Sequence, residues 1–226
     1  MLSREELREY AGWYLPPKEK HFQRWLQAGR ETDYQKDAYI NSLEYVKHAK
    51  IAIDVGANIG LMTRRYAKRF EEVHAFEPVQ VNNTCLKYNC DDLENVRIYD
   101  YALGEADEEM KIYNRKQYVN SGGWSIEDWQ NKDWVHFNEK TTLRSETIYV
   151  TTLDRFNLRP DFIKVDTQNY ELQVLKGAER TIKENKPIVQ LELEKKKMGD
   201  PIRDFMDQIG YKVLKQVKKD WIFGPK

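Results

Sequence analysis

Cysteine is scarce in this chain of 226 residues, and long apolar runs are missing. Cys85 and Cys90 lie five residues apart in a predicted helix, where facing side chains are three or four residues apart, so we expect no disulfide. No further cysteine or histidine lies near this pair to complete a metal site, and we expect no bound metal. No stretch is long enough to cross a membrane, and residues 1–7 lack the apolar core of a signal peptide. The sequence therefore predicts a cytoplasmic protein without membrane contact.

An excess of charge of either sign is also missing. Lysine and arginine together number 37, and aspartate and glutamate also number 37, so the formal net charge is zero. Domains whose main partner is nucleic acid usually carry a basic excess, so nucleic acid is not the expected partner. Charged residues make up 33% of the chain and the mean hydropathy is −0.82, which indicates a strongly solvated surface. The length fits one large domain with a substantial core.

The ten residues from Ile51 to Gly60 carry the most informative pattern. Residues 51–53 are a short apolar run typical of a strand buried on both faces, and Asp54 ends it. Small residues then recur at every second position before a helix-like stretch, namely Gly56, Asn58 and Gly60. Such a turn lets the backbone approach a ligand, and the helix N-terminus offers free N–H groups. The pattern predicts a nucleotide-type binding turn.

A second apolar run, residues 73–76, ends in Glu77 and Pro78. An acid about 20 residues beyond the first turn is where a ribose diol finds its hydrogen-bond acceptor. The glycine spacing is not that of a dinucleotide site. It resembles the first motif of class I S-adenosylmethionine (SAM) methyltransferases. The resemblance implies that the turn packs against the amino-acid end of SAM and that Glu77 holds both ribose hydroxyls. The alternative is an ordinary strand–helix turn with a surface glutamate.

Two regions follow from the patterns along the chain. Residues 1–48 are interpreted as an N-terminal helical cap, whose role is simple packing, a substrate lid or a dimer contact. Residues 49–226 alternate strand and helix patterns, which predicts an α/β domain with a mostly parallel sheet. Residues 114–146 interrupt this alternation as an irregular, polar and aromatic insertion. Strands are predicted at 51–55, 73–76, 96–101, 110–113, 147–153, 162–166, 187–194, 211–217 and 220–223, and helices at 60–70, 79–90, 171–185 and 201–209.

Five sequence blocks occur in the order typical of one family. From about residue 50 to about residue 195, the chain resembles the FkbM family of SAM-dependent methyltransferases. The blocks are Asp54–Gly60, Phe76–Pro78, Ala102–Gly104, Thr152–Asp154 and Phe162–Asp166 with Tyr170–Ala178. The resemblance implies a Rossmann-like class I fold with a seven-stranded sheet, a reversed last strand and helices on both faces. It also implies O-methylation of hydroxyls, often on sugars or polyketides.

One departure from the family concerns the turn after the fourth strand motif. The family usually has Asp-Val-Glu-Gly there, and this chain has Asp166-Thr167-Gln168-Asn169. Asparagine tolerates the left-handed conformation that glycine would adopt, so the turn can be kept. Gln168 can form hydrogen bonds but cannot act as a base, so activity would rest on Asp166 and neighbouring acids or would be weakened.

Methyl transfer to an alcohol requires alignment of the reactants and a base for the hydroxyl proton. Ligands of open α/β sheets bind beyond the carboxyl ends of the strands, where Asp166 and Glu192 are expected. We therefore predict that Asp166 is the base or hydroxyl anchor and that Glu192 assists it. The alternatives are a helix N-cap for Asp166 and an exposed strand end for Glu192.

The remaining candidate site residues flank these strand ends. Tyr101 and Ala102 follow the third strand and are expected to flank the adenine ring, unless Tyr101 belongs to the core. The expected acceptor contacts are Ser121, Gly122, Gly123, Trp124 and Gln168, and the alternative for 121–124 is a surface loop. The expected cofactor contacts are Asp54, Gly56, Asn58, Gly60, Glu77, Pro78, Tyr101, Ala102 and Asp166.

The sequence thus predicts a methyltransferase that uses SAM and releases S-adenosylhomocysteine, with a carbohydrate or other small polyhydroxylated acceptor. Two alternatives stay open. A nucleic-acid or protein methyltransferase could share the scaffold, although neutral charge and the lack of an Asn/Asp-Pro-Pro-Tyr/Phe motif count against it. A SAM-binding module without catalysis is the other, because of Gln168. The oligomeric state and the acceptor's identity are open at this point.

Overall fold

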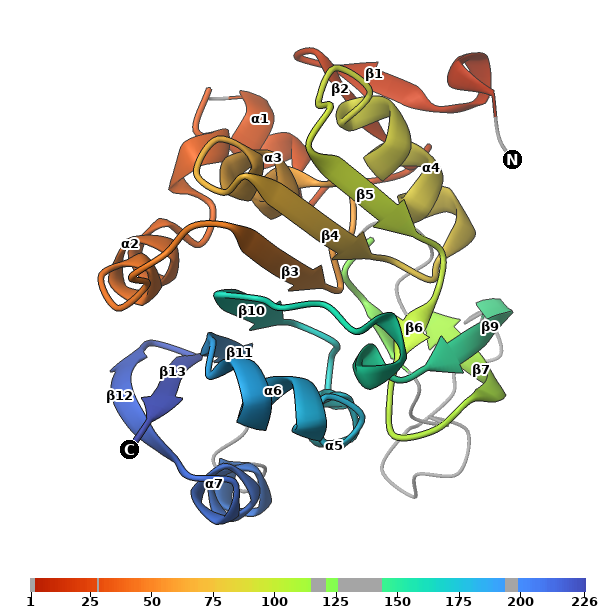
Figure 1. Cartoon of the computed structure of the whole chain (residues 1–226). Coiled ribbons are helices and arrows are strands. Elements are labelled where there is room, and N and C mark those ends of the chain that lie inside the picture. Colours follow the sequence, from red (N-terminus) through yellow and green to blue (C-terminus); the bar gives the residue numbers. More distant parts are fainter. Residues whose placement is uncertain (1–2, 28, 115–120, 126–143, 194–198) are drawn as a thin grey trace.

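A computed structural model of the chain describes residues 3–27, 29–114, 121–125, 144–193 and 199–226. A seven-stranded sheet forms its centre (Figure 1). Its strands, in spatial order, are β12 (Tyr211–Val217), β13 (Asp220–Pro225), β11 (Ile188–Glu192), β10 (Phe162–Val165), β3 (Ile51–Val55), β4 (Glu72–Phe76) and β5 (Val96–Tyr99). Strand β13 pairs antiparallel with β11 and β12, whereas the pairs from β11 to β5 are parallel. This is the predicted sheet with its reversed last strand.

Helices cover both faces of this sheet (Figure 1). Helices α3 (Leu61–Ala67) and α4 (Gln80–Asn89) lie over one face, and α5 (Glu171–Lys176), α6 (Glu179–Asn185) and α7 (Gly199–Gln208) lie over the other. Alternate residues of β3 serve the two cores, since Ala52 packs with Tyr66 and Phe70, and Ile53 packs with Val174 and Ile182. The apolar runs of the sequence are therefore strands buried on both faces, as predicted.

The predicted single helix over 171–185 is two helices in the structure. Gly177 lies between them, and a Cβ atom at this position would lie 1.7 Å from the carbonyl oxygen of Gly104. Asp154 marks the start of α6, because its carboxylate accepts hydrogen bonds from the backbone N–H groups of Arg180 and Thr181. Helix α5 therefore ends where the chain passes close to Gly104, and the Asp154 carboxylate caps the N-terminus of α6.

A smaller four-stranded sheet lies beside the carboxyl ends of β4 and β5 (Figure 1). Its strands, in spatial order, are β6 (Ala102–Leu103), β9 (Arg144–Thr151), β7 (Glu108–Asn114) and β8 (Trp124–Ser125), and η4 (Leu153–Phe156) follows β9. Much of the predicted insertion 114–146 lies outside the described residues. Its described parts are the end of β7, residues 121–125 with β8, and the start of β9.

The N-terminal 48 residues are less helical than predicted. After η1 (Arg4–Glu6), strands β1 (Arg8–Tyr10) and β2 (Trp13–Leu15) form an antiparallel hairpin, followed by α1 (Gln23–Gln27), η2 (Glu31–Asp33) and α2 (Lys36–Leu43). The hairpin turn, Ala11-Gly12, has positive φ angles of 51° and 78° at both positions, the requirement of a tight two-residue turn. The helical interpretation is therefore wrong for residues 8–15, whereas residues 23–27 and 36–43 are helices. A sparse apolar spacing cannot by itself distinguish a short hairpin from a helix.

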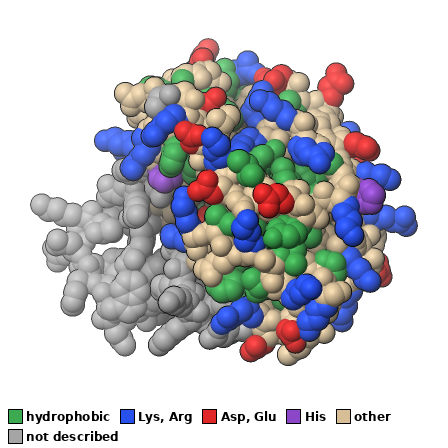
Figure 2. Space-filling view, turned by 90° about the vertical axis from the view of Figure 1, so that its left-hand side faces the viewer, with side chains coloured by type: hydrophobic (Ala, Val, Ile, Leu, Met, Phe, Trp, Pro, Cys, Tyr) green, Lys and Arg blue, Asp and Glu red, His purple; other side chains and the backbone are tan. Residues whose placement is uncertain are grey.

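One face of the molecule carries charges of both signs. Figure 2 shows basic and acidic side chains interspersed over one face, with a cluster of apolar side chains between them. Within the described part of the chain, none of the helices has the length and apolar character needed to span a membrane.

Candidate functional site

The strand register brings four strand ends to one level. Val55 of β3 pairs with Phe76 of β4 and with Val165 of β10, and Val165 pairs with Leu191 of β11. The next residue of each strand therefore lies at the same edge of the sheet, and these residues are Gly56, Glu77, Asp166 and Glu192. The sequence could place each of them at a strand end, but only the register makes them neighbours.

Glu77 lies against the small-residue turn. Its carboxylate accepts hydrogen bonds from the backbone N–H of Asn58 at 2.8 Å and of Val79 at 3.0 Å. The side chain is buried, and burial raises the pKa of Glu77 to about 7, partly offset by these two N–H donors. The turn at 56–60 and Glu77 thus converge at one place, as the sequence motif predicts.

The two glycines of this turn serve the packing of the protein itself. Gly56 has a φ of +79°, and a Cβ atom there would lie 2.1 Å from the backbone oxygen of Asp166. Gly60 has a φ of +93° and faces Leu86 and Cys90 of α4. The expectation that these glycines let the backbone approach a ligand is therefore incomplete, because neighbouring protein atoms already require them.

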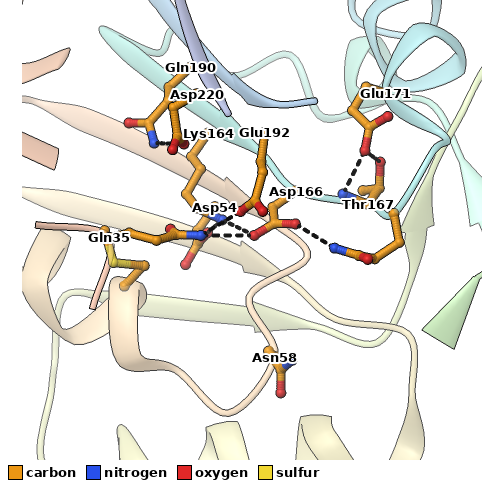
Figure 3. Close-up of polar contacts among 12 residues, drawn as sticks. Gln35, Asp54, Asn58, Lys164, Asp166, Thr167, Glu171, Gln190, Glu192 and Asp220 are labelled. Carbon is orange, nitrogen blue, oxygen red and sulfur yellow. Dashed lines mark hydrogen bonds and ion pairs between the residues drawn. The ribbon is translucent and has the colours of Figure 1, made fainter. Parts of the chain in front are cut away.

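A row of polar side chains crosses one face of the sheet just below these strand ends (Figure 3). Asp54 and Lys164 are register partners, and the Lys164 ammonium lies 3.8 Å from the Asp54 carboxylate. One oxygen of Asp54 accepts a hydrogen bond from the Thr63 hydroxyl at 2.7 Å, while its buried Oδ1 has no hydrogen-bond partner among the described residues. Burial raises the pKa of Asp54, although Lys164 and Thr63 oppose this shift.

The same row continues toward the reversed strand. The Gln190 amide donates to the Asp220 carboxylate at 2.8 Å, and burial raises the pKa of Asp220 to about 6. Burial alone would lower the pKa of Lys164, but the carboxylates of Asp166 and Asp54 outweigh it, so this pKa lies above its usual value. Lys164 therefore remains a cation. In the described part of the chain, no three His, Cys, Asp or Glu side chains are arranged to hold a metal ion.

Asp166 is held by three side chains. Its carboxylate lies 3.3 Å from the Lys164 ammonium and accepts hydrogen bonds from Gln35 at 3.2 Å and from Gln168 at 3.1 Å. Burial acts to raise the pKa of Asp166, but the charge of Lys164 and the amide donors prevail and hold it below its usual value. Asp166 is therefore ionised at neutral pH.

Glu192 lies beside Asp166 and, unlike Asp166, is mainly protonated at neutral pH. Repulsion from the Asp166 carboxylate, followed by burial, raises the pKa of Glu192 to about 8. The amide of Gln35 donates to Glu192 at 2.8 Å as well as to Asp166, so one NH₂ group bridges the two acids. At neutral pH the pair therefore holds one proton, mainly on Glu192.

The alternative role of Asp166 as a helix cap is wrong. Glu171, the first residue of α5, accepts hydrogen bonds from the backbone N–H groups of Thr167 and Asn169 instead. Gln168 and Asn169 both have positive φ angles, 55° and 81°, so asparagine keeps the left-handed turn as expected. The Gln168 amide donates to Asp166, and in the described part of the chain α5 has no side-chain cap.

A cavity of about 270 Å³ runs along the carboxyl edge of the sheet, and Asp54, Glu77, Lys164, Asp166 and Glu192 line it. One end lies at the ends of β3 to β5, with Glu77 and Ala102, and the other at the ends of β10 and β11, with Lys219 beyond them. Of the predicted site residues, the cavity is lined by Asp54, Gly56, Asn58, Glu77, Pro78, Tyr101, Ala102, Ser121, Gly122, Trp124, Asp166, Gln168 and Glu192. Gly60 and Gly123, although predicted, do not line it. Tyr101 is 41% exposed, so its alternative assignment to the core is wrong.

Residues 121–125 form one wall of the cavity. The Ser121 hydroxyl donates to the Asn58 side chain at 2.9 Å, and the Ser125 hydroxyl donates to the backbone oxygen of Gln168 at 3.2 Å. The segment thus runs from the turn after β3 to the turn after β10. The buried carboxylate of Glu19 accepts a hydrogen bond from the Ser121 backbone N–H and joins this wall to the N-terminal region.

Sequence reasoning missed the contribution of the N-terminal region and of the strand interiors. His21, Phe22 and Tyr34 line the cavity, and Gln35 contacts its two acids. Nothing in their spacing marks them, because they reach the site only through the packing of residues 1–48 on the sheet. Lys164 does carry a signal, since a lysine within the apolar run 162–165 must find a buried partner.

Comparison with known proteins adds three structural relatives. The FkbM methyltransferase from Methylobacillus flagellatus KT is 18% identical with a TM-score of 0.52, and the match covers 99% of this chain and 56% of that one. The ribosomal protein L11 methylase from Lactobacillus delbrueckii subsp. bulgaricus is 9% identical with a TM-score of 0.53, covering 87% of this chain and 78% of the other. The precorrin 8W decarboxylase from Methanobacterium thermoautotrophicum is 10% identical with a TM-score of 0.51, covering 84% and 90%.

These likenesses establish the fold alone, and this chain spans little more than half the length of the first relative. No protein with a curated function matches the chain. Residues 54–213, however, match the family described as "Methyltransferase FkbM domain", and this region includes both strand-end motifs and the pair of acids. The chain therefore belongs to the FkbM methyltransferase domain family.

Proposed function

We propose that this methyltransferase takes its methyl group from SAM and transfers it to a hydroxyl of a carbohydrate or another small polyhydroxylated acceptor. S-adenosylhomocysteine would be the second product. The observation that carries the proposal is a single cavity with a nucleoside-type turn at one end and a singly protonated pair of acids at the other. A methyl donor and an alcohol need these two kinds of group side by side.

The residues of the cofactor end fit SAM. Each oxygen of the Glu77 carboxylate accepts one backbone N–H, and the Asn82 side chain donates a third hydrogen bond, which leaves one lone pair for a ribose hydroxyl. Asp54 Oδ1, which lies 3.8 Å from the Lys164 ammonium and has no hydrogen-bond partner among the described residues, could accept the ammonium group of the methionine part. Tyr101 and Ala102 would flank the adenine, and Pro78 would border it. When bound, SAM would supply an electrophilic methyl group on a sulfonium that leaves readily.

Asp166 and Glu192 would have different roles at the acceptor end. A base acts best when its pKa lies near the working pH, so Glu192, with a pKa of about 8, would be the better proton acceptor once it is ionised, and its ionised share grows as the pH approaches 8. Asp166 stays ionised and would hold the acceptor hydroxyl by a charge-assisted hydrogen bond. Lys164 keeps Asp166 ionised from below. Both acids would therefore touch the reacting hydroxyl, Asp166 as anchor and Glu192 as base.

The polar lining supports a polyhydroxylated acceptor. Carboxylates and amides at this end accept hydrogen bonds, which suits a ligand rich in hydroxyl donors. Trp124 could stack on a sugar ring, with Ser121, Gly122, Gly123 and Gln168 beside it. The bonds from Ser121 to Asn58 and from Ser125 to Gln168 would hold this wall over both substrates.

Two measurements test the proposal. Calorimetry with SAM and with S-adenosylhomocysteine should show binding. Transfer of a labelled methyl group should occur to a panel of neutral methyl glycosides, and not to RNA or to a protein mixture. Absence of SAM binding would refute the cofactor. Binding without transfer to any acceptor would favour a SAM-binding module, consistent with glutamine at position 168, and transfer to RNA or protein would favour the rival methyltransferase class.

A variant separates binding from chemistry. Asp166→Asn should abolish transfer while SAM affinity stays unchanged, because the amide cannot serve as an anionic anchor. Asp100→Asn is the matched control, since Asp100 is exposed at the end of the third parallel strand and should leave both quantities unchanged. Unchanged transfer in Asp166→Asn would remove Asp166 from the mechanism.

A further inference from the structure

Gln35 enters the site from outside the region that matches the family. It lies between η2 and α2, and the family match begins only at residue 54. Its side-chain NH₂ group donates to Asp166 Oδ2 at 3.2 Å and to Glu192 Oε2 at 2.8 Å (Figure 3). One neutral donor thus bridges the two acids, which also form a hydrogen bond with one another.

The conformation of Gln35 is unfavourable in two respects. Its backbone φ is 49°, in the left-handed region that side chains other than glycine and asparagine rarely adopt. Its carbonyl Oε1 is buried without a hydrogen-bond partner among the described residues. An amide free to choose its orientation would satisfy both ends, so the two bonds to the acids decide its orientation.

The segment around Gln35 is firmly held. Arg65 donates to the backbone oxygen of Tyr34 at 2.7 Å, and its guanidinium lies 3.9 Å from the centre of the Tyr39 ring. On the following turn, Asp37 forms an ion pair with Lys218 at 2.8 Å. These contacts fix the amide of Gln35 over the acids and maintain its strained backbone.

We infer that Gln35 is a positioning residue of the methyl-transfer site: its amide holds Asp166 and Glu192 together in the geometry in which one anchors and the other accepts a proton. The inference rests on the proposed function for the roles of the two acids. It assigns to the N-terminal region a part in the chemistry that the family domain does not itself supply.

Replacement of Gln35 should change the pKa of Glu192. Among the described residues, the charged and titratable groups around the pair are Lys164 of β10, Asp54 of β3, Asp220 of β13, Glu171 of α5 and Tyr34 before α2, with Lys219 and His21 also lining the cavity. All of these remain when Gln35 is replaced. Loss of the amide removes a donor from both carboxylates and disfavours ionisation of the second acid, so the pKa of Glu192 should rise above 8.

Gln35→Met tests the inference in the full-length protein, because methionine has a similar length and no donor. Carboxyl ¹³C NMR should show the titration midpoint of Glu192 moving upward by about one pH unit. Gln35→Glu, which adds a third carboxyl group, should move it further and provides a second variant if the first folds poorly. Gln27→Ala, which changes an exposed glutamine of α1, is the matched control and should leave the midpoint in place.

The enzymatic readout is the rate of labelled methyl transfer to the methyl glycoside panel. Gln35→Met should lower kcat at least tenfold at pH 7, shift the pH–rate profile to higher pH, and leave the Kd for SAM unchanged. Wild-type titration behaviour in both Gln35 variants would overturn the inference. Failure of the wild-type protein to bind SAM would refute the proposed function instead, and the NMR result on the acids would still stand.

Discussion

At the scale of single residues, the site depends on how burial and neighbouring donors divide protons among acids. Glu77, Asp166 and Glu192 are ordinary carboxylic acids in the sequence, yet the structure raises two of their pKa values and lowers the third. The direction depends on whether the charge of Lys164 and the hydrogen-bond donors outweigh burial and the neighbouring carboxylate, as they do at Asp166 but not at Glu77 or Glu192. Their different roles therefore come from the surroundings of each side chain.

The protonation of Glu77 leads to a pH-dependent affinity for SAM. Ribose hydroxyls would donate to the ionised carboxylate, so binding would release the proton that a pKa of about 7 leaves partly bound. Affinity should rise from pH 6 to pH 8, and calorimetry in buffers of different ionisation enthalpy should detect the released proton. Glu77→Ala should weaken SAM by about 2 kcal/mol, roughly 30-fold, at pH 8 and remove the pH dependence.

Exposed Glu71 provides the control for this experiment, since Glu71→Ala leaves the cavity unchanged. An unaltered affinity in Glu77→Ala would refute the ribose assignment. A pH-independent affinity in the wild-type protein would show that Glu77 is already ionised before SAM binds.

Gly56 provides a stability prediction with a matched glycine. Gly56 and Gly210 both have φ near +80°, but a Cβ atom at 56 would overlap the oxygen of Asp166, whereas nothing lies within 4 Å at 210. Gly210→Ala should cost about 1 kcal/mol of unfolding free energy from backbone strain alone. Gly56→Ala should cost about 4 kcal/mol or more, because two strand ends must separate. Urea unfolding of both variants measures the difference, and equal losses would contradict this account.

At the scale of elements, the Asn89 side chain of α4 forms hydrogen bonds with the N-terminal hairpin, and the ring of Tyr88 in α4 contacts the ring of Tyr14 in β2. Asn89 accepts a hydrogen bond from the Tyr14 backbone N–H at 2.7 Å and donates to the backbone oxygens of Tyr14 and Ile59. Its amide therefore pairs with the backbone of β2 as a residue of a neighbouring strand would. It also holds the turn that precedes α3. Buried Leu15 and Phe22 complete the attachment by packing against Ile59 and Leu61.

Asn89→Ala should loosen this attachment. The loss of three buried hydrogen bonds should cost about 3 kcal/mol, given about 1 kcal/mol for each bond. Amide hydrogen exchange should accelerate in residues 8–15 more than in β3 or β10. Asn41→Ala, which removes one exposed bond to Asp37, is the control and should change neither quantity by more than about 0.5 kcal/mol. Equal exchange in both variants would show that apolar packing alone holds the hairpin.

The elements also show where sequence patterns suffice. The parallel strands and the terminal hairpin were predictable because each is a short apolar or alternating run bounded by turn residues. The division of residues 171–185 into two helices was not predictable. The break at Gly177 is caused by close contact with Gly104, about 70 residues earlier in the chain. The hairpin at 8–15 was missed because its few apolar residues fit either period.

At the scale of the whole molecule, the cavity lies where three parts of the chain meet. The sheet supplies the acids, residues 121–125 supply one wall, and the N-terminal region supplies Tyr34 and Gln35. A ligand that fills this cavity should stabilise all three parts together, because it binds only when they are assembled.

Thermal unfolding measures this linkage. SAM at 100 times its Kd should add about 2.7 kcal/mol, which raises the Tm of a protein of this size by about 5–10 °C. S-adenosylhomocysteine should also raise the Tm, since it keeps the adenosyl and amino-acid groups. ATP is the control, because its triphosphate would meet the carboxylates of the cavity and should leave the Tm unchanged. A rise with ATP equal to that with SAM would indicate a general nucleotide site.

The sequence by itself determined the alternation of strands and helices, the family, and the small-residue turn with an acid after the next strand, because these follow from local periodicity and short motifs. Only the tertiary structure decided which strand ends are neighbours, that Lys164 lies beside Asp54, and that Gln35 bridges the two acids. The physical reason is that hydrogen bonds and charge interactions act over a few ångströms in space. The sequence does not encode such distances between residues more than 100 positions apart in any local pattern.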